Sequence, residues 1–142
     1  MIIDASVLLQ AFFPDEAQVQ AQAVVGEHIA GRLRLKAPAL LPYELSSAVL
    51  NAERRGRISA SQGDEILLAM GDLEIEIVTQ EWGEVLPLAR QYGRSAYDAA
   101  YQALAEQLDE ALVTGDLRLY NAVKEHLDRV IWIGDYPLEK SP

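Results

Sequence analysis

The chain has 142 residues and no cysteine, and half of its residues are hydrophobic. This length and composition suit one folded domain with a sizeable core, and they exclude disulfides, thiolate metal sites and cysteine nucleophiles. The formal net charge of −10 argues against nonspecific nucleic-acid binding, which needs a basic surface. Either the excess acid lines a metal pocket and solvated faces, or it attracts a basic segment of a partner protein.

Short strands and helices alternate along the chain, with Pro and Gly residues between them. In chain order we expect a strand at 1–6, helices at 7–13 and 17–31, a strand at 33–37, helices at 42–55 and 59–70, a strand at 74–78, helices at 81–92 and 98–108, a strand at 111–114, a helix at 117–127 and a strand at 130–133. Residues 111–114 form a continuous apolar run, as expected of a central parallel strand.

Alternating strands and helices without a hairpin signal predict a three-layer α/β/α fold with a parallel, Rossmann-like sheet. We expect a single domain, 1–142, with a loose tail from about Pro137. No apolar run approaches the roughly 20 residues that cross a bilayer, and no signal peptide is expected, since the first strand is expected to begin at Met1. A cytoplasmic protein without a membrane partner is therefore expected.

Four acidic residues stand where such a fold brings distant parts of the chain together. Asp4 and Asp116 each follow an apolar strand, whereas Glu44 and Asp98 each lie in the first turn of an expected helix. Open parallel sheets place their ligands outside the carboxyl ends of the strands. Four carboxylates at that edge repel one another unless a cation neutralises them, and hard cations such as Mg²⁺ or Mn²⁺ prefer oxygen ligands.

Each acid also has a purely structural explanation. An Asp after a strand commonly caps the next helix, and an acid in a first turn complements the helix dipole. Asp4 fits this explanation least, since it follows three apolar residues and no Lys or Arg lies near it in the chain. Burying such a carboxylate costs several kcal/mol unless it is paired. The set as a whole therefore favours a functional site.

The segments around these acids resemble the PIN-domain ribonucleases, in particular the VapC toxins of toxin–antitoxin pairs. They are residues 1–9, 42–45 with 48–50, 95–101 with 103–105, and 112–116 with Leu119, in the family's order and spacing. The resemblance implies catalytic, metal-binding roles for Asp4, Glu44, Asp98 and Asp116. It also implies that two small polar residues, Ser6 and Thr114, support them.

The chemistry implied is hydrolysis of RNA phosphodiesters by a Mg²⁺- or Mn²⁺-dependent endoribonuclease that leaves 5′-phosphate and 3′-hydroxyl ends. Mg²⁺ keeps several waters and needs few protein ligands, so four carboxylates suffice for one ion, or for two when substrate oxygens help. Asp4 and Asp98 are expected to ligate directly, and Glu44 and Asp116 directly or through water. Replacing Asp4 or Asp98 by Ala is expected to abolish cleavage.

Contacts with the RNA substrate are expected from Arg90, Arg94, Tyr97 and Asn121. The two arginines precede Asp98 closely enough to reach a phosphate near the metal, and Tyr97 is suited to stacking on a base. The resemblance further implies a homodimer and a cognate antitoxin. Such a partner would bind an apolar groove near Phe12 and Phe13 and send a basic side chain into the acidic pocket.

Two other functions remain open from the sequence. One is a non-catalytic PIN scaffold that uses the same pocket for binding only. The other is a metal-dependent phosphoryl-transfer domain of the receiver or phosphatase kind. Receivers need two adjacent acids early in the chain and a Lys after a late strand, whereas Asp4 stands alone and Lys140 falls in the expected tail. Haloacid-type phosphatases need a second Asp two residues after the first, where this chain has Ser6.

Overall fold

A computed structural model describes residues 1–138 of the chain. Residues 139–142, which include Lys140 and most of the expected tail, lie outside the described residues. The sheet has five strands, all parallel, in the order β3-β2-β1-β4-β5. The strands are β1 (Ile2–Ile3), β2 (Lys36–Pro38), β3 (Glu76–Val78), β4 (Leu112–Thr114) and β5 (Val130–Trp132).

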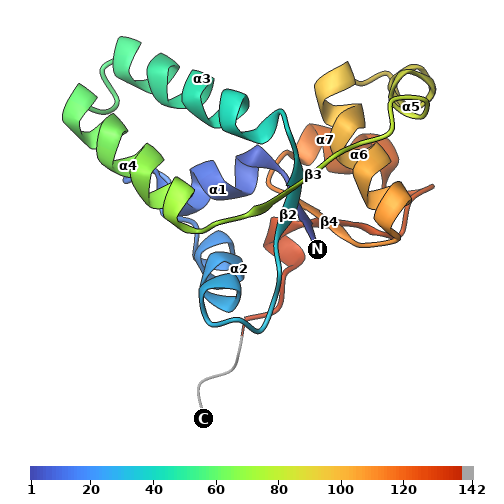
Figure 1. The fold of residues 1–142 in the computed structure, drawn as a ribbon, viewed down its shortest axis with the longest axis horizontal. Helices are drawn as coiled ribbons and strands as arrows, with labels where there is room; N and C mark the ends of the chain where they lie inside the picture. The colour runs from blue at the N-terminus through green and yellow to red at the C-terminus, as the bar shows by residue number, and fades with distance from the viewer. Residues whose placement is uncertain (139–142) are drawn as a thin grey trace.

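Helices cover both faces of this sheet. They are α1 (Ala5–Phe12), α2 (Val19–Ile29), α3 (Leu41–Arg54), α4 (Ala60–Asp72), α5 (Val85–Tyr92), α6 (Ala96–Leu108) and α7 (Leu117–Val123), with a short 3-10 turn, η1 (Ile133–Asp135). Helices α1–α4 lie on one side and α5–α7 on the other (Figure 1), as right-handed crossovers in this strand order require. The three-layer α/β/α prediction is confirmed. Within residues 1–138, no helix is long and apolar enough to span a bilayer.

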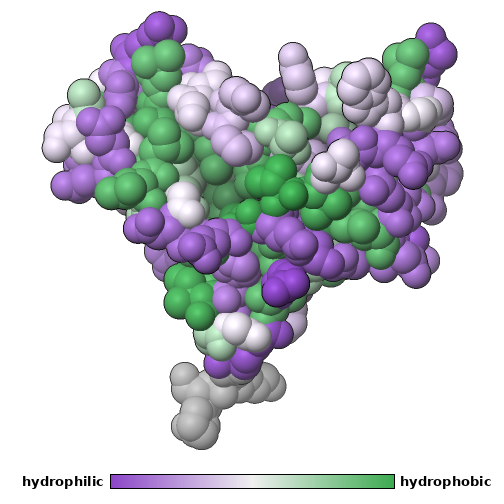
Figure 2. All heavy atoms as spheres, viewed as in Figure 1, coloured by the Kyte–Doolittle hydropathy of each residue, from purple (hydrophilic) through white to green (hydrophobic). Residues whose placement is uncertain are grey.

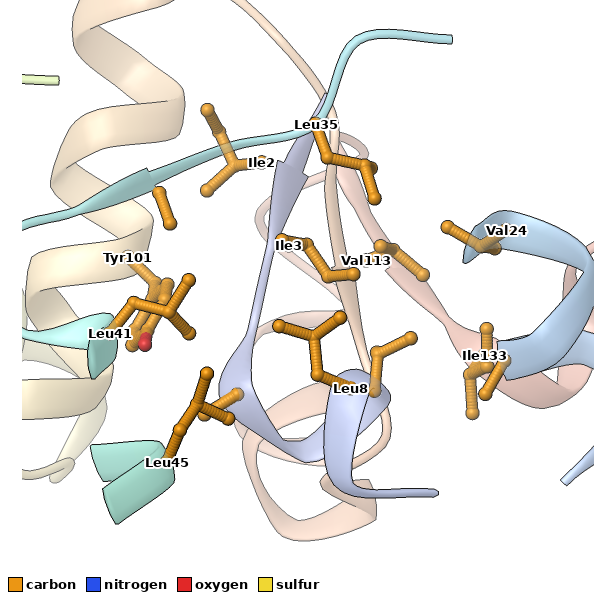
Figure 3. Close-up of a cluster of buried hydrophobic side chains, with 14 of the residues drawn as sticks. Ile2, Ile3, Leu8, Val24, Leu35, Leu41, Leu45, Tyr101, Val113 and Ile133 are labelled. Carbon is orange, nitrogen blue, oxygen red and sulfur yellow. The ribbon is translucent and has the colours of Figure 1, made fainter. Parts of the chain in front are cut away.

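The central strands β1 and β4 carry the core because helices cover them on both faces. Ile2 and Ile3 are fully buried, and so is Val113, which pairs with Ile3. Figure 3 shows Ile3 and Val113 facing Leu8 and Ile133 on one side of β1. Leu41 and Leu45, from the first turns of α3, lie to the left of β1 in Figure 3 beside Tyr101 from α6. Successive side chains of a strand point to opposite faces, so Ile2 and Ile3 pack into different parts of the core (Figure 3).

Several element ends differ from expectation. Helix α1 begins at Ala5 instead of Val7, because the Val7 amide already bonds the Asp4 carbonyl at 3.1 Å. Helix α2 begins at Val19 instead of Ala17, since Ala17 adopts a left-handed conformation (φ 39°) that no helix continues through. Strand β1 is correspondingly short and ends before Asp4.

Two helices on the other face are shorter than expected. Helix α5 begins at Val85, four residues late, and the Glu81 amide bonds the side chain of Gln107 on α6 instead of entering a helix. Helix α7 ends at Val123, where the His126 amide bonds the Val123 carbonyl at 3.0 Å, a tighter pattern than the α-helical one. Neither difference moves a residue of the acidic set.

Candidate functional site

A pocket of about 590 Å³ opens at the carboxyl ends of β1 and β4. The chain leaves β1 toward β2 on one side while β4 lies on the other, so this is the point where the strand order reverses and where α/β sheets bind ligands. The walls come from α1, α3 and the first turn of α6, and the hollow is visible at the upper edge of Figure 2. All four acids line it: Asp4, Glu44, Asp98 and Asp116.

Asp4 is the most buried of the four, with 6% of its surface exposed. It occupies the position before α1, yet its side chain does not cap that helix. One oxygen, Oδ2, instead accepts hydrogen bonds from the Ser6 and Thr114 hydroxyls, each at 2.8 Å. Burial raises the pKa of the Asp4 carboxyl, the two hydroxyls oppose that rise, and the charges of Asp98 and Asp116 add to it.

The hydroxyls that hold Asp4 are themselves fixed by the backbone after β4. The Gly115 amide donates to Ser6 Oγ at 2.8 Å, and the Asp116 amide donates to Thr114 Oγ1 at 3.0 Å. A Cβ at position 115 would stand 2.5 Å from Gln10 Oε1, so a side chain there would have to displace the end of Gln10. The ends of β1 and β4 are therefore tied together through polar bonds that converge on one carboxylate.

Asp116 combines the structural and the functional explanation. Its Oδ1 accepts from the Arg118 amide at 2.9 Å and the Leu119 amide at 3.3 Å, so it caps α7. The other oxygen, Oδ2, accepts no hydrogen bond within the described residues. The sequence could not choose between a helix cap and a pocket acid here, and the structure shows one oxygen in each role.

Glu44 lies in the first turn of α3, behind Pro42, and points into the pocket region from the opposite wall. Its Oε1 is buried and has no hydrogen-bond partner in residues 1–138. Burial raises the pKa of the Glu44 carboxyl, the nearby Tyr101 hydroxyl offsets part of the rise, and Asp4 and Asp98 reinforce it. No Lys or Arg forms an ion pair with either Asp4 or Glu44 in the described part of the chain.

Asp98 lies in the first turn of α6, where the Ser95 hydroxyl caps the helix by accepting from the Asp98 amide at 3.1 Å. Its carboxylate is paired with Arg94. Arg94 Nε and Nη2 lie 3.1 and 2.9 Å from Asp98 Oδ2, and Nη2 lies 3.9 Å from Asp116 Oδ2. Arg94 thus stands between two of the four acids.

The donor set fits a hard cation, although the side chains do not enclose one as they stand. Among the residues that the structure describes, no three Asp, Glu or His side chains are close enough together to surround an ion. The Asp98 carboxylate bonds Arg94. Within residues 1–138, three other carboxylate oxygens accept no hydrogen bond: Asp4 Oδ1, Glu44 Oε1 and Asp116 Oδ2. These oxygens are of the type that Mg²⁺ and Mn²⁺ prefer.

Of the other residues expected to contact RNA, one lines the pocket and two do not. Tyr97 is 66% exposed and lines the pocket, whereas Arg90 and Asn121 are exposed on α5 and α7 and do not line it. Three further residues, which were not expected from the sequence, line the pocket from α3: Tyr43, Ser47 and Asn51. Ser47 and Asn51 lie three and seven residues after Glu44, the spacing of one helix face, and that periodicity could have identified them.

Comparison with known proteins places this geometry in a family. The chain matches the PIN domain over residues 1–125. It is 33% identical over 124 residues to Ribonuclease VapC9 of Mycobacterium tuberculosis, covering 84% of this chain and 87% of that protein. It is 28% identical over 123 residues to Ribonuclease VapC3 of Pyrobaculum aerophilum, covering 84% and 91%.

A solved structure agrees with these sequence relatives. The crystal structure of PAE2754 from Pyrobaculum aerophilum superposes with a TM-score of 0.72 at 25% identity, covering 94% of this chain and 83% of that one. The matched span, residues 1–125, contains all four pocket acids and every strand of the sheet except β5. This protein belongs to the PIN domain family.

Proposed function

We propose that this protein is a Mg²⁺- or Mn²⁺-dependent endoribonuclease of the VapC type, which hydrolyses RNA phosphodiesters. One observation carries the proposal: four carboxylates from four separate elements line one pocket, and Asp4, the most buried of them, has no Lys or Arg paired with it within residues 1–138. Such an arrangement costs folding free energy, which a bound divalent cation would offset. The names of the relatives, VapC3 and VapC9 ribonucleases, support the same activity.

The pocket residues have two roles: the carboxylates would bind the cation, and the hydroxyls orient one of these carboxylates. Asp4, Glu44, Asp98 and Asp116 would hold the cation, which supplies charge neutralisation for an anionic phosphodiester and a bound water of lowered pKa. Ser6 and Thr114 keep Asp4 in one orientation through the two hydroxyl bonds at 2.8 Å.

The rim of the pocket carries aromatic groups suited to single-stranded RNA. Tyr43 and Tyr97 are 77% and 66% exposed and line the pocket from α3 and α6. An exposed tyrosine ring offers a stacking surface for an unpaired base.

Cleavage of labelled RNA with the purified protein tests the proposal. We expect cleavage in Mg²⁺ or Mn²⁺, loss of cleavage in EDTA, and 5′-phosphate and 3′-hydroxyl ends on the products. Undiminished cleavage in EDTA would contradict the metal dependence. RNA binding without cleavage under any of these conditions would instead indicate a scaffold, and labelling of the protein by a phospho-donor would indicate phosphoryl transfer.

An antitoxin partner is part of the proposal. A second hollow of about 300 Å³ is continuous with the main pocket through Ser6, Leu9 and Asn51. The net charge of −10 and the four acids of the main pocket favour a partner segment with a basic side chain that reaches that pocket. Phe13 is 3% exposed and lies beneath Arg57, so it forms the floor of this hollow rather than an open groove.

Co-expression tests the toxin assignment. A small DNA-binding protein encoded beside this reading frame should relieve growth arrest caused by expressing this chain. If expression of the Asp98→Asn variant without the neighbouring protein caused no growth arrest, the arrest would depend on the pocket. A cytoplasmic location belongs to the same proposal, because RNA and such a partner would be met there.

A homodimer is also proposed. The strand β3 is at the edge of the sheet, and beside it runs an apolar groove lined by Leu41, Leu45, Leu67, Met70, Ile75 and Ile77. Figure 2 shows hydrophobic surface at the centre of this face. Burying that surface against a second copy would protect the exposed edge. Light scattering should give the mass of a dimer, and Ile77→Lys should give that of a monomer.

A further inference from the structure

Arg94 is the one cation that the described residues place against the pocket acids. Its Nε and Nη2 both donate to Asp98 Oδ2, and Nη2 lies 3.9 Å from Asp116 Oδ2. The Arg94 and Asp98 side chains are each 22% exposed, and that of Asp116 is 35% exposed. The contact is therefore partly shielded from water, where charge-assisted bonds are stronger than on an open surface.

The backbone on both sides of Arg94 is fixed. Gly93 ends α5 in a left-handed conformation (φ 62°), and the Arg94 amide bonds the Ala89 carbonyl at 3.0 Å. Directly after it, Ser95 caps α6. These two helix ends leave Arg94 on a short, well-defined turn, from which its side chain reaches the carboxylate one helical turn ahead. The pairing with Asp98 is thus built into the α5–α6 junction.

Arg94 bonds one oxygen that a metal ion would need, Asp98 Oδ2, and forms a longer ion pair with another, Asp116 Oδ2. Asp116 Oδ1 is already committed to capping α7, so Oδ2 is its free donor, and Oδ2 is the oxygen that faces Arg94. Asp98 Oδ2 accepts both guanidinium bonds. A divalent cation that bound these oxygens would lie close to the positive Arg94 guanidinium, and the two like charges would repel each other.

We propose that Arg94 is a built-in counter-ion of the metal-free pocket, and that a divalent cation displaces it from Asp98 and Asp116 and frees it for a phosphate of the RNA. This exchange rests on the proposed function, since it takes the same carboxylates as metal ligands. It gives Arg94 two opposite effects. The side chain weakens metal binding, and it strengthens RNA binding once the metal is in place.

Binding of Mn²⁺ to the full-length protein, followed by electron paramagnetic resonance of the free ion without RNA, tests the first effect. Arg94→Leu removes the charge and the bonds, and we expect about three- to tenfold tighter Mn²⁺ binding. Arg94→Lys keeps a cation at this position and should restore most of the weaker wild-type affinity. Arg34→Leu removes a positive charge at the opposite end of the sheet, where Arg34 is 76% exposed, and should leave the affinity unchanged.

The second effect is measured with saturating Mn²⁺ and a short single-stranded RNA. Loss of one phosphate contact should flatten the dependence of log(kcat/KM) on log[salt] by about 0.7, the value expected per phosphate for single strands. Arg94→Leu should show that smaller slope, and Arg34→Leu should keep the wild-type slope. An unchanged slope in Arg94→Leu would overturn the phosphate role.

The outcomes separate this inference from the function on which it rests. Equal or weaker Mn²⁺ binding by Arg94→Leu, with normal binding by the wild type, would overturn the exchange and leave the metal site intact. Absence of Mn²⁺ binding by both proteins would overturn the metal-dependent function as well. Thermal melts in EDTA confirm that each variant is folded, so a loss of binding is not a loss of structure.

Discussion

The two ends of the sheet hold their acidic side chains in opposite ways. At the amino end, Glu110 bonds the Met1 amino group at 2.5 Å and Lys36 Nζ at 2.6 Å, and these cations outweigh its desolvation and lower its pKa. At the carboxyl end, Asp4 and Glu44 have no ion-pair partner within residues 1–138, and burial raises the pKa of both. Protein cations neutralise Glu110 at the amino end, whereas no Lys or Arg within residues 1–138 neutralises Asp4 or Glu44 at the carboxyl end.

This contrast separates a structural acid from a functional one more clearly than burial alone. Glu110 joins the N-terminus to β2, so its charge contributes to holding strands together. Asp4 is held only by hydroxyls, which orient a carboxylate without neutralising it. An acid that a fold buries, orients and leaves unneutralised is suited to a cation from outside.

The largest difference should appear in catalysis. Asp4→Asn keeps the size of the side chain and an oxygen for both hydroxyl bonds, yet removes the charge that would hold a metal. We expect at least about a thousandfold loss of RNA cleavage, because a metal-dependent site loses its deepest ligand. Glu110→Gln is the matched change at the other end of the sheet and should cleave RNA at close to the wild-type rate. Similar losses in both variants would erase the distinction between the two ends.

A smaller loss of metal affinity or activity is expected when Asp4 is kept but one of the hydroxyls that orient it is removed. Thr114→Val and Ser6→Ala each remove one hydroxyl that donates to Asp4 Oδ2. We expect each to reduce Mn²⁺ affinity or kcat by about 10- to 100-fold, the usual cost of losing a group that orients a metal ligand. Thr79→Val removes a threonine hydroxyl outside the residues that line the pocket and serves as the control. Wild-type metal affinity in Thr114→Val would show that the hydroxyl bonds are only structural.

Stability should change in opposite directions at the two ends. Without metal, Asp4→Asn relieves an unneutralised buried charge and should raise the free energy of unfolding by about 1–2 kcal/mol. Glu110→Gln breaks two charge-assisted bonds and should lower it by about 1–2 kcal/mol. Urea unfolding in EDTA measures both changes. A stabilised Glu110→Gln protein, or a destabilised Asp4→Asn protein, would contradict the comparison.

The smallest expected effect is in the pH dependence of the unfolding free energy, which should differ between Asp4 and Glu110. The folded-state pKa of Asp4 is raised above its ordinary value of 3.8, so its ionised form costs stability above the raised pKa. That cost should disappear as pH falls toward 3.8, and the stability advantage of Asp4→Asn should shrink with it. The pKa of Glu110 is lowered from 4.5, so its contribution is present above 4.5 and lost as pH falls through the lowered value.

These two curves come from the difference in unfolding free energy between each variant and the wild type, measured from pH 7 downward in EDTA. Both differences should decrease toward acid, but the Asp4 curve should begin to decrease at higher pH than the Glu110 curve. If the two curves decreased over the same range, the ends of the sheet would not differ in how they treat their acids.

Much of the fold followed from the sequence because its signals are local. The apolar run of 111–114 predicted a buried central strand, and β4 occupies Leu112–Thr114. Gly93 and Ser95 marked the end of one helix and the start of the next, as the left-handed φ of Gly93 and the cap of Ser95 show. The predicted starts of two helices were wrong because of features that the sequence does not signal. Ala17 adopts a left-handed conformation before α2, and the Glu81 amide bonds the Gln107 side chain before α5.

The sequence also determined which acids would share the pocket, because a parallel sheet brings the residues after β1 and β4 to one edge regardless of their separation along the chain. It could not determine what each oxygen does there. The tertiary structure decided that Asp116 divides its oxygens between a helix cap and the pocket, and that Arg94 reaches two acids at once. The succession of strands and helices follows from patterns along the chain, whereas hydrogen-bond partners depend on distances of a few ångströms between elements that only packing brings together.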